Sequence, residues 1–146
     1  MPSLVAEIIQ QLPPKLATGT DITPAANHLF TINNKAKKLG KSEAELFHRL
    51  TAQLLYLCKR SRPDLQTAVA FLTTRVSCPD IDDMRKLGRC IRYLRRTSHY
   101  PLILEASCLR NVQWWVDASY AVHPDMRSHT GATMMIGKGS VYSMST

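Results

Sequence analysis

The chain has 146 residues, a formal net charge of +8 and a hydrophobic fraction of 45%. This length accommodates one or two small domains, and the hydrophobic fraction excludes a disordered chain. The excess of Lys and Arg over Asp and Glu favours a partner with negative charge, nucleic acid above all. No segment resembles a membrane-spanning helix or a secretory signal, so we expect an intracellular protein, cytoplasmic or nuclear, with no membrane partner.

Helical periodicity begins at the N-terminus. Apolar side chains recur at helical spacing from Leu4 to Leu12, and a pair of prolines ends that pattern. Residues 15–41 mix Thr, Gly, Pro, Asn and Lys, and they predict an irregular connection. Residues 42–45 have the form of a capping box, with Ser42 as the cap and Glu45 as its partner, and they predict the start of a second helix.

Two further helices follow. The run from Arg62 to Asp64 predicts a helix start because proline is favoured in a first helical turn, and Pro79 lies just beyond the expected end. Asp80 starts the next helix, in which the apolar positions 84, 87, 91 and 94 step by three and four. Short links between these segments predict antiparallel packing of three helices.

The last third of the chain reads as strands. Residues 102–104, 112–117, 133–136 and 141–144 are rich in apolar or β-branched side chains, and glycines between the last two predict a hairpin. The sequence therefore predicts an α+β fold with helices first and strands second.

The helix predicted over residues 81–97 is unusually basic. On a wheel of about 100° per residue, its arginines at positions 85, 89, 92 and 96 fall on one stripe away from the apolar positions. No acidic residue occurs between positions 84 and 104, so we expect the stripe to lack local partners and to be free for phosphates, with Tyr93 and Tyr100 available for stacking. The candidate nucleic-acid-binding residues are Arg85, Lys86, Arg89, Arg92, Arg95 and Arg96. The alternative is a solvated face whose arginines complement the helix macrodipole, as Asp82 and Asp83 do at its start.

Asp117 is a candidate metal ligand and catalytic residue. It ends an apolar run that predicts a strand, and a carboxylate on a rigid strand is well placed to hold a cation. The alternative is a structural aspartate that accepts hydrogen bonds from turn amides. The four cysteines, at positions 58, 78, 90 and 108, are too dispersed for a zinc site or a disulfide framework, so we expect reduced thiols.

Several ordered segments resemble one family, the polyprotein of copia-type retrotransposons. The matching segments are FHRLTAQLLYL at 47–57, RPDLQTAV at 62–69, LGRCIRYLRRT at 87–97, VDASYAVHPDMRSHTG at 116–131 and GKGSVYSMST at 137–146. The resemblance implies a thumb and connection region of a reverse transcriptase that continues into the start of a ribonuclease H domain. It divides the chain into an N-terminal helix and linker over residues 1–41, a thumb/connection-like region over 42–100, and a partial ribonuclease H-like domain over 101–146.

The resemblance also implies chemistry and partners. Thumb helices of the family lie along a template–primer duplex, so RNA–DNA hybrid or DNA duplex is the expected partner, together with the remainder of the polyprotein. Asp117 matches a magnesium ligand of the ribonuclease H two-ion site, whereas Asp125 matches a loop position. The polymerase aspartates would precede Met1 and the other ribonuclease H carboxylates would follow Thr146, so we expect a chain that is inactive alone and holds no stable Mg²⁺. The alternatives are a non-catalytic nucleic-acid-binding or protein-interaction module from a decayed or co-opted element, and the product of a pseudogene.

Overall fold

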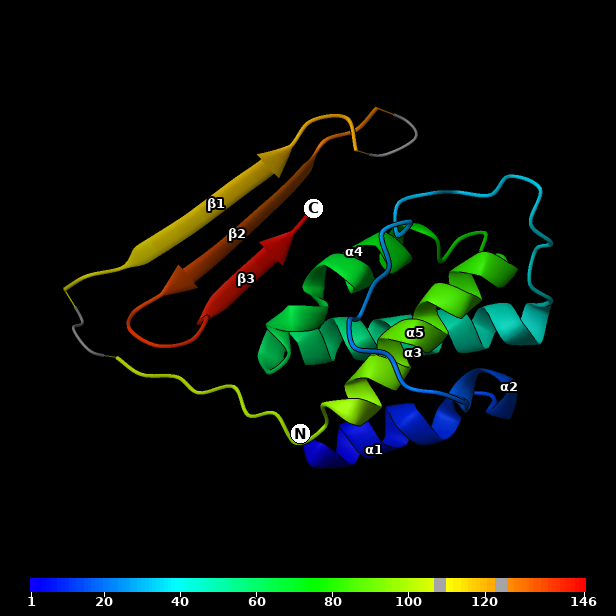
Figure 1. Ribbon diagram of the computed structural model, residues 1–146, viewed down its shortest axis with the longest axis horizontal. Helices are drawn as coiled ribbons and strands as arrows, with labels where there is room; N and C mark the ends of the chain where they lie inside the picture. The colour runs from blue at the N-terminus through cyan, green and yellow to red at the C-terminus, as the bar shows by residue number, and fades with distance from the viewer. Residues whose placement is uncertain (107–109, 123–125) are drawn as a thin grey trace.

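The computed structural model describes residues 1–106, 110–122 and 126–146. Helices come first and strands last, in the predicted α+β arrangement (Figure 1). The helices are α1 (Pro2–Gln11), α2 (Pro14–Ala17), α3 (Lys41–Arg60), the 3₁₀ turn η1 (Pro63–Leu65), α4 (Gln66–Thr74) and α5 (Ile81–Arg96). The strands are β1 (Gln113–Ser119), β2 (His129–Met135) and β3 (Tyr142–Ser145). None of the described helices has the length and apolarity that crossing a membrane requires.

One apolar core unites the helices. Every buried apolar side chain in the described part of the chain lies between Val5 and Leu94, and α1, α3, α4 and α5 all contribute to it. Leu29, from the linker between α2 and α3 (residues 18–40), joins the same core. Full burial of one leucine contributes about 2 kcal/mol, so this cluster is the main source of stability. We call residues 2–97 the helical body.

The start of α5 is fixed by a capping box at the predicted residue. Asp80 Oδ1 accepts hydrogen bonds from the backbone amides of Asp82 and Asp83, each at 3.0 Å, and Asp83 Oδ2 accepts the Asp80 amide at 3.1 Å. Arg75 pairs with both capping carboxylates, at 3.4 Å to Asp80 and 3.1 Å to Asp83. The Arg75 guanidinium is shared by two buried carboxylates, and it therefore fixes the start of α5 against the end of α4.

The predicted start of α3 is wrong by two residues. The cap is Gly40, whose amide donates to Glu43 Oε2 at 3.3 Å, and the helix begins at Lys41. Ser42 therefore lies inside the first turn. In a capping box, a glutamate three residues after the cap accepts a hydrogen bond from the cap amide. Both Gly40–Glu43 and Ser42–Glu45 have this spacing, so the spacing alone does not distinguish them. The short helix α2 also lies where an irregular connection was predicted.

The strand predicted over residues 102–104 does not form. Just after this segment, the Glu105 amide donates to the Lys138 carbonyl at 2.9 Å. A strand needs a ladder of backbone hydrogen bonds, and one bond does not form a ladder. It passes so close to the β2–β3 turn that a Cβ at Gly139 would collide with the Ile103 carbonyl oxygen. Gly139 also has φ +78°, which favours glycine at this turn.

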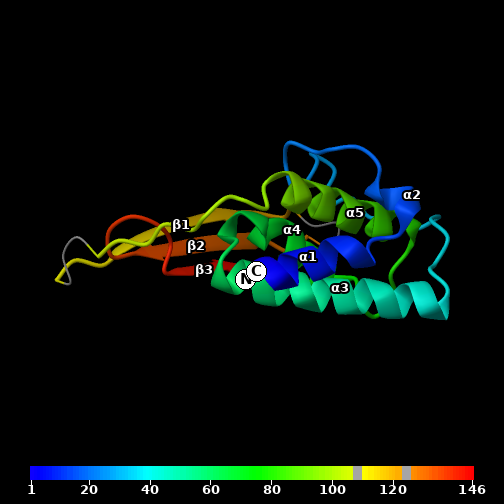
Figure 2. The ribbon, with the colours of Figure 1, turned by 90° about the horizontal axis from the view of Figure 1, so that it is seen from below.

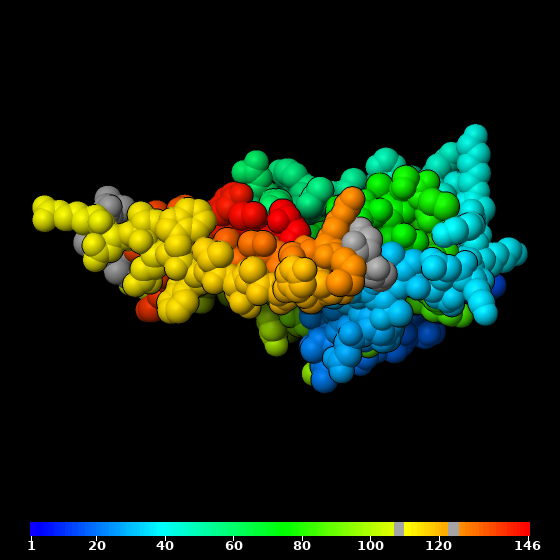
Figure 3. Space-filling model, turned by 90° about the horizontal axis from the view of Figure 1, so that it is seen from above, coloured from blue at the N-terminus to red at the C-terminus, as the bar shows by residue number. Residues whose placement is uncertain are grey.

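The three strands form one antiparallel sheet in the order β1-β2-β3. Asp117 of β1 is opposite Gly131 of β2, and Gly131 is opposite Ser145 of β3. β3 lies beside α4, whereas β1 is the strand farthest from the helices (Figure 1). The sheet extends away from the helical body as a thin layer (Figures 2 and 3), so much of it has no helix over it.

Candidate nucleic-acid interface

α5 has an apolar face and a basic face, as its periodicity predicts. Met84, Leu87, Ile91 and Leu94 are buried in the core. Of the six predicted cations, Arg85 and Arg96 are the most exposed. The Arg85 side chain is 69% exposed and its NH1 donates to Asp82 Oδ1 at 2.6 Å, whereas Arg96 has no ion pair or hydrogen bond within the described residues.

The expectation that the arginine stripe lacks partners is wrong for Arg85, which pairs with Asp82, and for two further members. Asp21, from the linker, accepts from Arg92 Nε at 2.7 Å and lies 3.3 Å from Arg89 NH1. Arg92 NH1 also donates to the Leu16 carbonyl at 2.7 Å. Because Asp21 is 71 residues from Arg92 in the sequence, counting acidic residues near α5 does not reveal it. Arg89 and Arg92 therefore bind the linker to the helix.

The two flanking cations also contact the linker region through backbone oxygens. Arg95 donates to the carbonyls of Ala17, at 2.7 Å, and Gly19. Lys86 Nζ donates to the Thr31 carbonyl at 2.6 Å and lies 4.5 Å from the centre of the Phe71 ring. Burial lowers the pKa of the Lys86 ammonium, against the opposing effect of nearby carboxylates. These hydrogen bonds to carbonyls position the charges without neutralising them.

The basic face keeps a positive excess after these contacts. Its six cations face two acidic partners, Asp21 and Asp82, which leaves a formal excess of four positive charges. The hydrogen bond from Asn33 and the ion pair with Arg85 both lower the pKa of Asp82, so this carboxyl is ionised near neutral pH. The face therefore attracts anions even with its internal pairs formed.

The two tyrosines proposed for stacking differ in availability. The Tyr93 hydroxyl donates to Asp64 Oδ2 at 2.9 Å and its ring lies 5.6 Å from the Arg62 guanidinium, so it is engaged within the protein. Tyr100 is 57% exposed and packs edge-on against His99, with 4.8 Å between ring centres. Tyr100 is the tyrosine that a base or sugar can reach.

A buried arginine that the sequence reading missed anchors the end of α5. Arg62 donates to the Thr97 carbonyl at 3.1 Å, to Thr97 Oγ1 at 2.6 Å and to both oxygens of Asp64. Burial raises the pKa of Asp64, but the hydrogen bond and charge of Arg62 outweigh it, and the pKa falls below 3.8. The run from Arg62 to Asp64 predicts the start of a helix. The two-residue spacing of its arginine and aspartate also allows the ion pair, which the prediction did not include.

Asp117 lies on β1 as predicted, and it is exposed. Its Oδ1 accepts the Ala118 amide at 2.9 Å, and the residue borders an open cleft of about 590 Å³ between the sheet and the start of α4. Across the described part of the chain, no three His, Cys, Asp or Glu side chains gather into a group that fits a metal ion. A two-ion magnesium site needs several carboxylates, so these residues alone do not fit one. Asp125 lies outside the described residues.

The described cysteines are free thiols, as expected. Cys58 and Cys90 are buried, and desolvation raises their pKa values to about 11 and about 12. Such thiols stay protonated and are poor nucleophiles at neutral pH. Cys78 is exposed, and Cys108 lies outside the described residues.

Comparisons of the chain with protein-family models, with curated proteins and with solved structures give no significant match.

Proposed function

We propose that this chain is the thumb/connection and early ribonuclease H segment of a copia-type reverse transcriptase, and that it binds RNA–DNA hybrid or DNA duplex along α5. The observation that carries the proposal is the positive excess on the exposed face of α5. Phosphate contacts require cations spaced along a surface, and an α-helix returns to the same face every 5.4 Å, so the cations of one face form a line that can follow a strand of phosphates. The ordered sequence segments that resemble the family supply the second line of support.

The internal contacts divide the basic face into two groups. Arg85 and Arg96 point their charge to solvent and are the first candidates for phosphate contact. The other four hold the linker or the end of α2 and contribute to duplex binding mainly through their electrostatic field: Lys86, Arg89, Arg92 and Arg95. The formal excess of four positive charges corresponds to a log–log salt slope of roughly −3 to −4, of which the two exposed arginines account for about 2.

Asp117 enters the proposal as one inherited magnesium ligand of an incomplete site. A lone carboxylate binds Mg²⁺ weakly, because the ion keeps its waters unless several oxygens replace them. The chain by itself therefore binds duplex without cutting it. The alternative, a binding module from a decayed or co-opted element, shares the basic face and differs only in lacking any role for Asp117.

The test is duplex binding by fluorescence anisotropy over a series of salt concentrations. The double variant Arg85→Gln/Arg96→Gln removes exposed charge without touching the Asp21 contacts. We expect weaker binding to RNA–DNA hybrid and a salt slope flattened by about 2, since two phosphate contacts are lost.

The matched control removes two exposed cations from another surface. Arg49→Gln/Arg60→Gln changes the net charge equally, but both residues lie on α3. We expect a nearly unchanged slope. A third pair, Lys35→Gln/Lys37→Gln, samples exposed lysines of the linker. If the slope flattens for the linker or α3 pair and not for the α5 pair, the proposed interface is wrong.

A further inference from the structure

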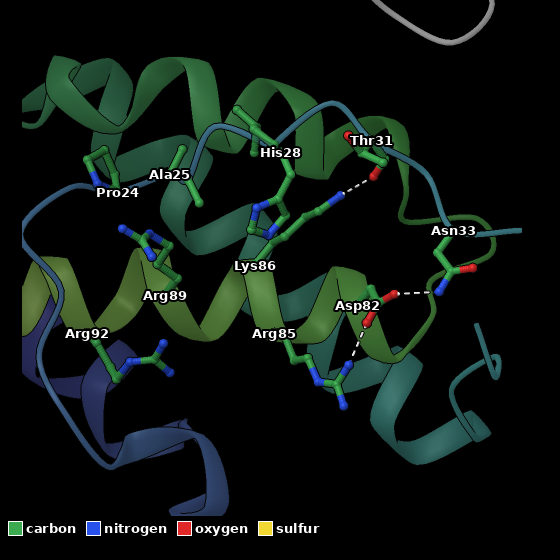
Figure 4. A pocket seen from close by; sticks show the side chains of 12 residues that line it. Pro24, Ala25, His28, Thr31, Asn33, Asp82, Arg85, Lys86, Arg89 and Arg92 are labelled. Atoms are coloured by element: carbon green, nitrogen blue, oxygen red, sulfur yellow. Dashed lines mark hydrogen bonds and ion pairs between the residues drawn. The ribbon is translucent and has the colours of Figure 1, made fainter. Parts of the chain in front are cut away.

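A pocket lies between the linker and α5, and we call it the α5 pocket (Figure 4). Residues 24–33 form one wall and the first three turns of α5 form the other, around a volume of about 340 Å³. Figure 4 shows Pro24, Ala25 and His28 on the linker side, across from Arg89 and Lys86 of α5. A volume of this size is at the lower end of small-molecule sites and is too small for a duplex.

The two walls of the α5 pocket differ in chemistry. The α5 wall carries one acidic residue, Asp82. It also carries four cations: Arg85, Lys86, Arg89 and Arg92. The linker wall is largely apolar, with Pro24, Ala25 and Leu29, and it adds the His28 ring. A ligand that matches both walls has an anionic group at one end and a flat or apolar body at the other.

One donor in the pocket wall lacks an acceptor. Arg89 Nε is buried, and it has no hydrogen-bond partner within the described part of the chain. The same guanidinium uses NH1 for Asp21 and NH2 for Thr23 Oγ1, at 2.9 Å. A buried N–H without a partner costs about 1–3 kcal/mol, so an acceptor at this position would stabilise the protein.

The linker wall is held in place by hydrogen bonds on both sides of the pocket. Arg89 binds Thr23 at one side, and Lys86 binds the Thr31 carbonyl at the other. Asn33 donates to Asp82 at 3.0 Å and closes the far end. Because the walls are already joined, a ligand need not order them, and little affinity is lost to rearrangement.

We infer that the α5 pocket binds one nucleoside monophosphate unit, with its phosphate against the arginines and its base against the linker wall. The unit has two possible sources, a free nucleotide or the 5′-phosphorylated end of a nucleic-acid strand. The α5 pocket shares Arg85 with the proposed duplex surface, but binding of the nucleotide unit does not require duplex binding.

The test is isothermal titration of the full chain with AMP, inorganic phosphate and adenosine. We expect AMP to bind at least about tenfold more tightly than either half, because only AMP contacts both walls. Ala25→Phe fills the pocket from the linker side and leaves every charge in place, so it should abolish AMP binding while the duplex salt slope stays unchanged. Ala26→Phe, on the same wall, is the second filling variant if the first unfolds.

Charge variants complete the test. Arg85→Gln, at an exposed position, should weaken AMP about tenfold through loss of a charge-assisted hydrogen bond, whereas Lys37→Gln outside the pocket should not. Competition by a 5′-phosphorylated strand, and not by its 5′-hydroxyl form, would identify the strand end as the source. Competition by nucleotides alone would identify the free nucleotide. Failure of AMP to bind, equal affinity for inorganic phosphate, or AMP binding that survives both filling variants would overturn the inference.

Discussion

The helical body and the sheet are built from similarly apolar sequence but reach opposite degrees of burial. Leu50, Leu54 and Leu94 are fully buried in the helical body, whereas Trp115 and Val116 of β1 are 63% and 68% exposed. Within the described residues, Ser145 is the one buried position beyond Thr97. Apolar residues stabilise a fold only where a second layer covers them, and the helices cover one another while β1 has no such layer. Stability therefore concentrates in the helical body.

The largest expected effect compares two leucines, one from each region. Leu94→Ala, at a fully buried position, should lower the free energy of unfolding by about 3 kcal/mol through lost burial and cavity formation. Leu104→Ala, at a position 56% exposed, should cost less than about 1 kcal/mol. Urea denaturation followed by helical circular dichroism measures both. Equal losses would show that residues beyond α5 belong to the same cooperative core.

The second effect concerns the Arg62 anchor. Arg62→Met should lower the free energy of unfolding by about 2 kcal/mol at neutral pH, because Thr97 and Asp64 lose their buried donor. The folded pKa of Asp64 is depressed, so its stabilising contribution is full above the unfolded value of 3.8 and is lost as the pH falls through the folded pKa. The difference between wild type and variant should therefore shrink below pH 3.8, measured by denaturation across pH. A constant difference would mean that packing of Arg62, rather than its charge, stabilises this corner.

The third effect separates the two groups of arginines on α5. Arg92→Gln should destabilise the chain by about 1 kcal/mol because it breaks the partly buried contact with Asp21. Arg96→Gln should change stability by less than about 0.5 kcal/mol and act on duplex affinity instead. Thermal unfolding and anisotropy on the same two variants check this division. The reverse pattern would mean that Arg92, and not Arg96, meets the phosphates.

The smallest expected effect is at Asp117. RNA–DNA hybrid incubated with the chain and Mg²⁺ should remain intact, because one carboxylate does not hold two ions. Asp117→Asn should alter neither stability nor duplex binding measurably, since among the described residues the side chain bonds just its neighbour's amide. If the proposed function holds, adding the downstream carboxylate-bearing segment of a copia-type ribonuclease H should give cleavage that Asp117→Asn abolishes. Cleavage by the present chain that survives Asp117→Asn and removal of contaminating nuclease would require a different active site.

Local signals predicted much of the helical body. The Asp80 cap and the spacing of Met84, Leu87, Ile91 and Leu94 define α5 through contacts within one or two turns. The strand at 102–104 was mispredicted because strand formation needs a partner, and the sequence of one segment does not report whether a partner lies beside it. The Asp21 contacts were missed for the same reason. A linker of more than twenty residues had to fold back onto α5 before its carboxylate met the arginines, and no periodicity encodes that path. The α5 pocket depends on the same path of the linker, because linker residues form one of its walls.

Hydrogen exchange on the full chain, with and without RNA–DNA hybrid, tests the central claim most directly, since it reports stability and binding residue by residue. The account predicts slow exchange in α3 and α5, faster exchange in β1, and further slowing in α5 when the hybrid is added. Protection of β1 equal to that of α5 would contradict the contrast between the two regions. Slowing confined to the sheet on addition of hybrid would contradict the placement of the interface on α5.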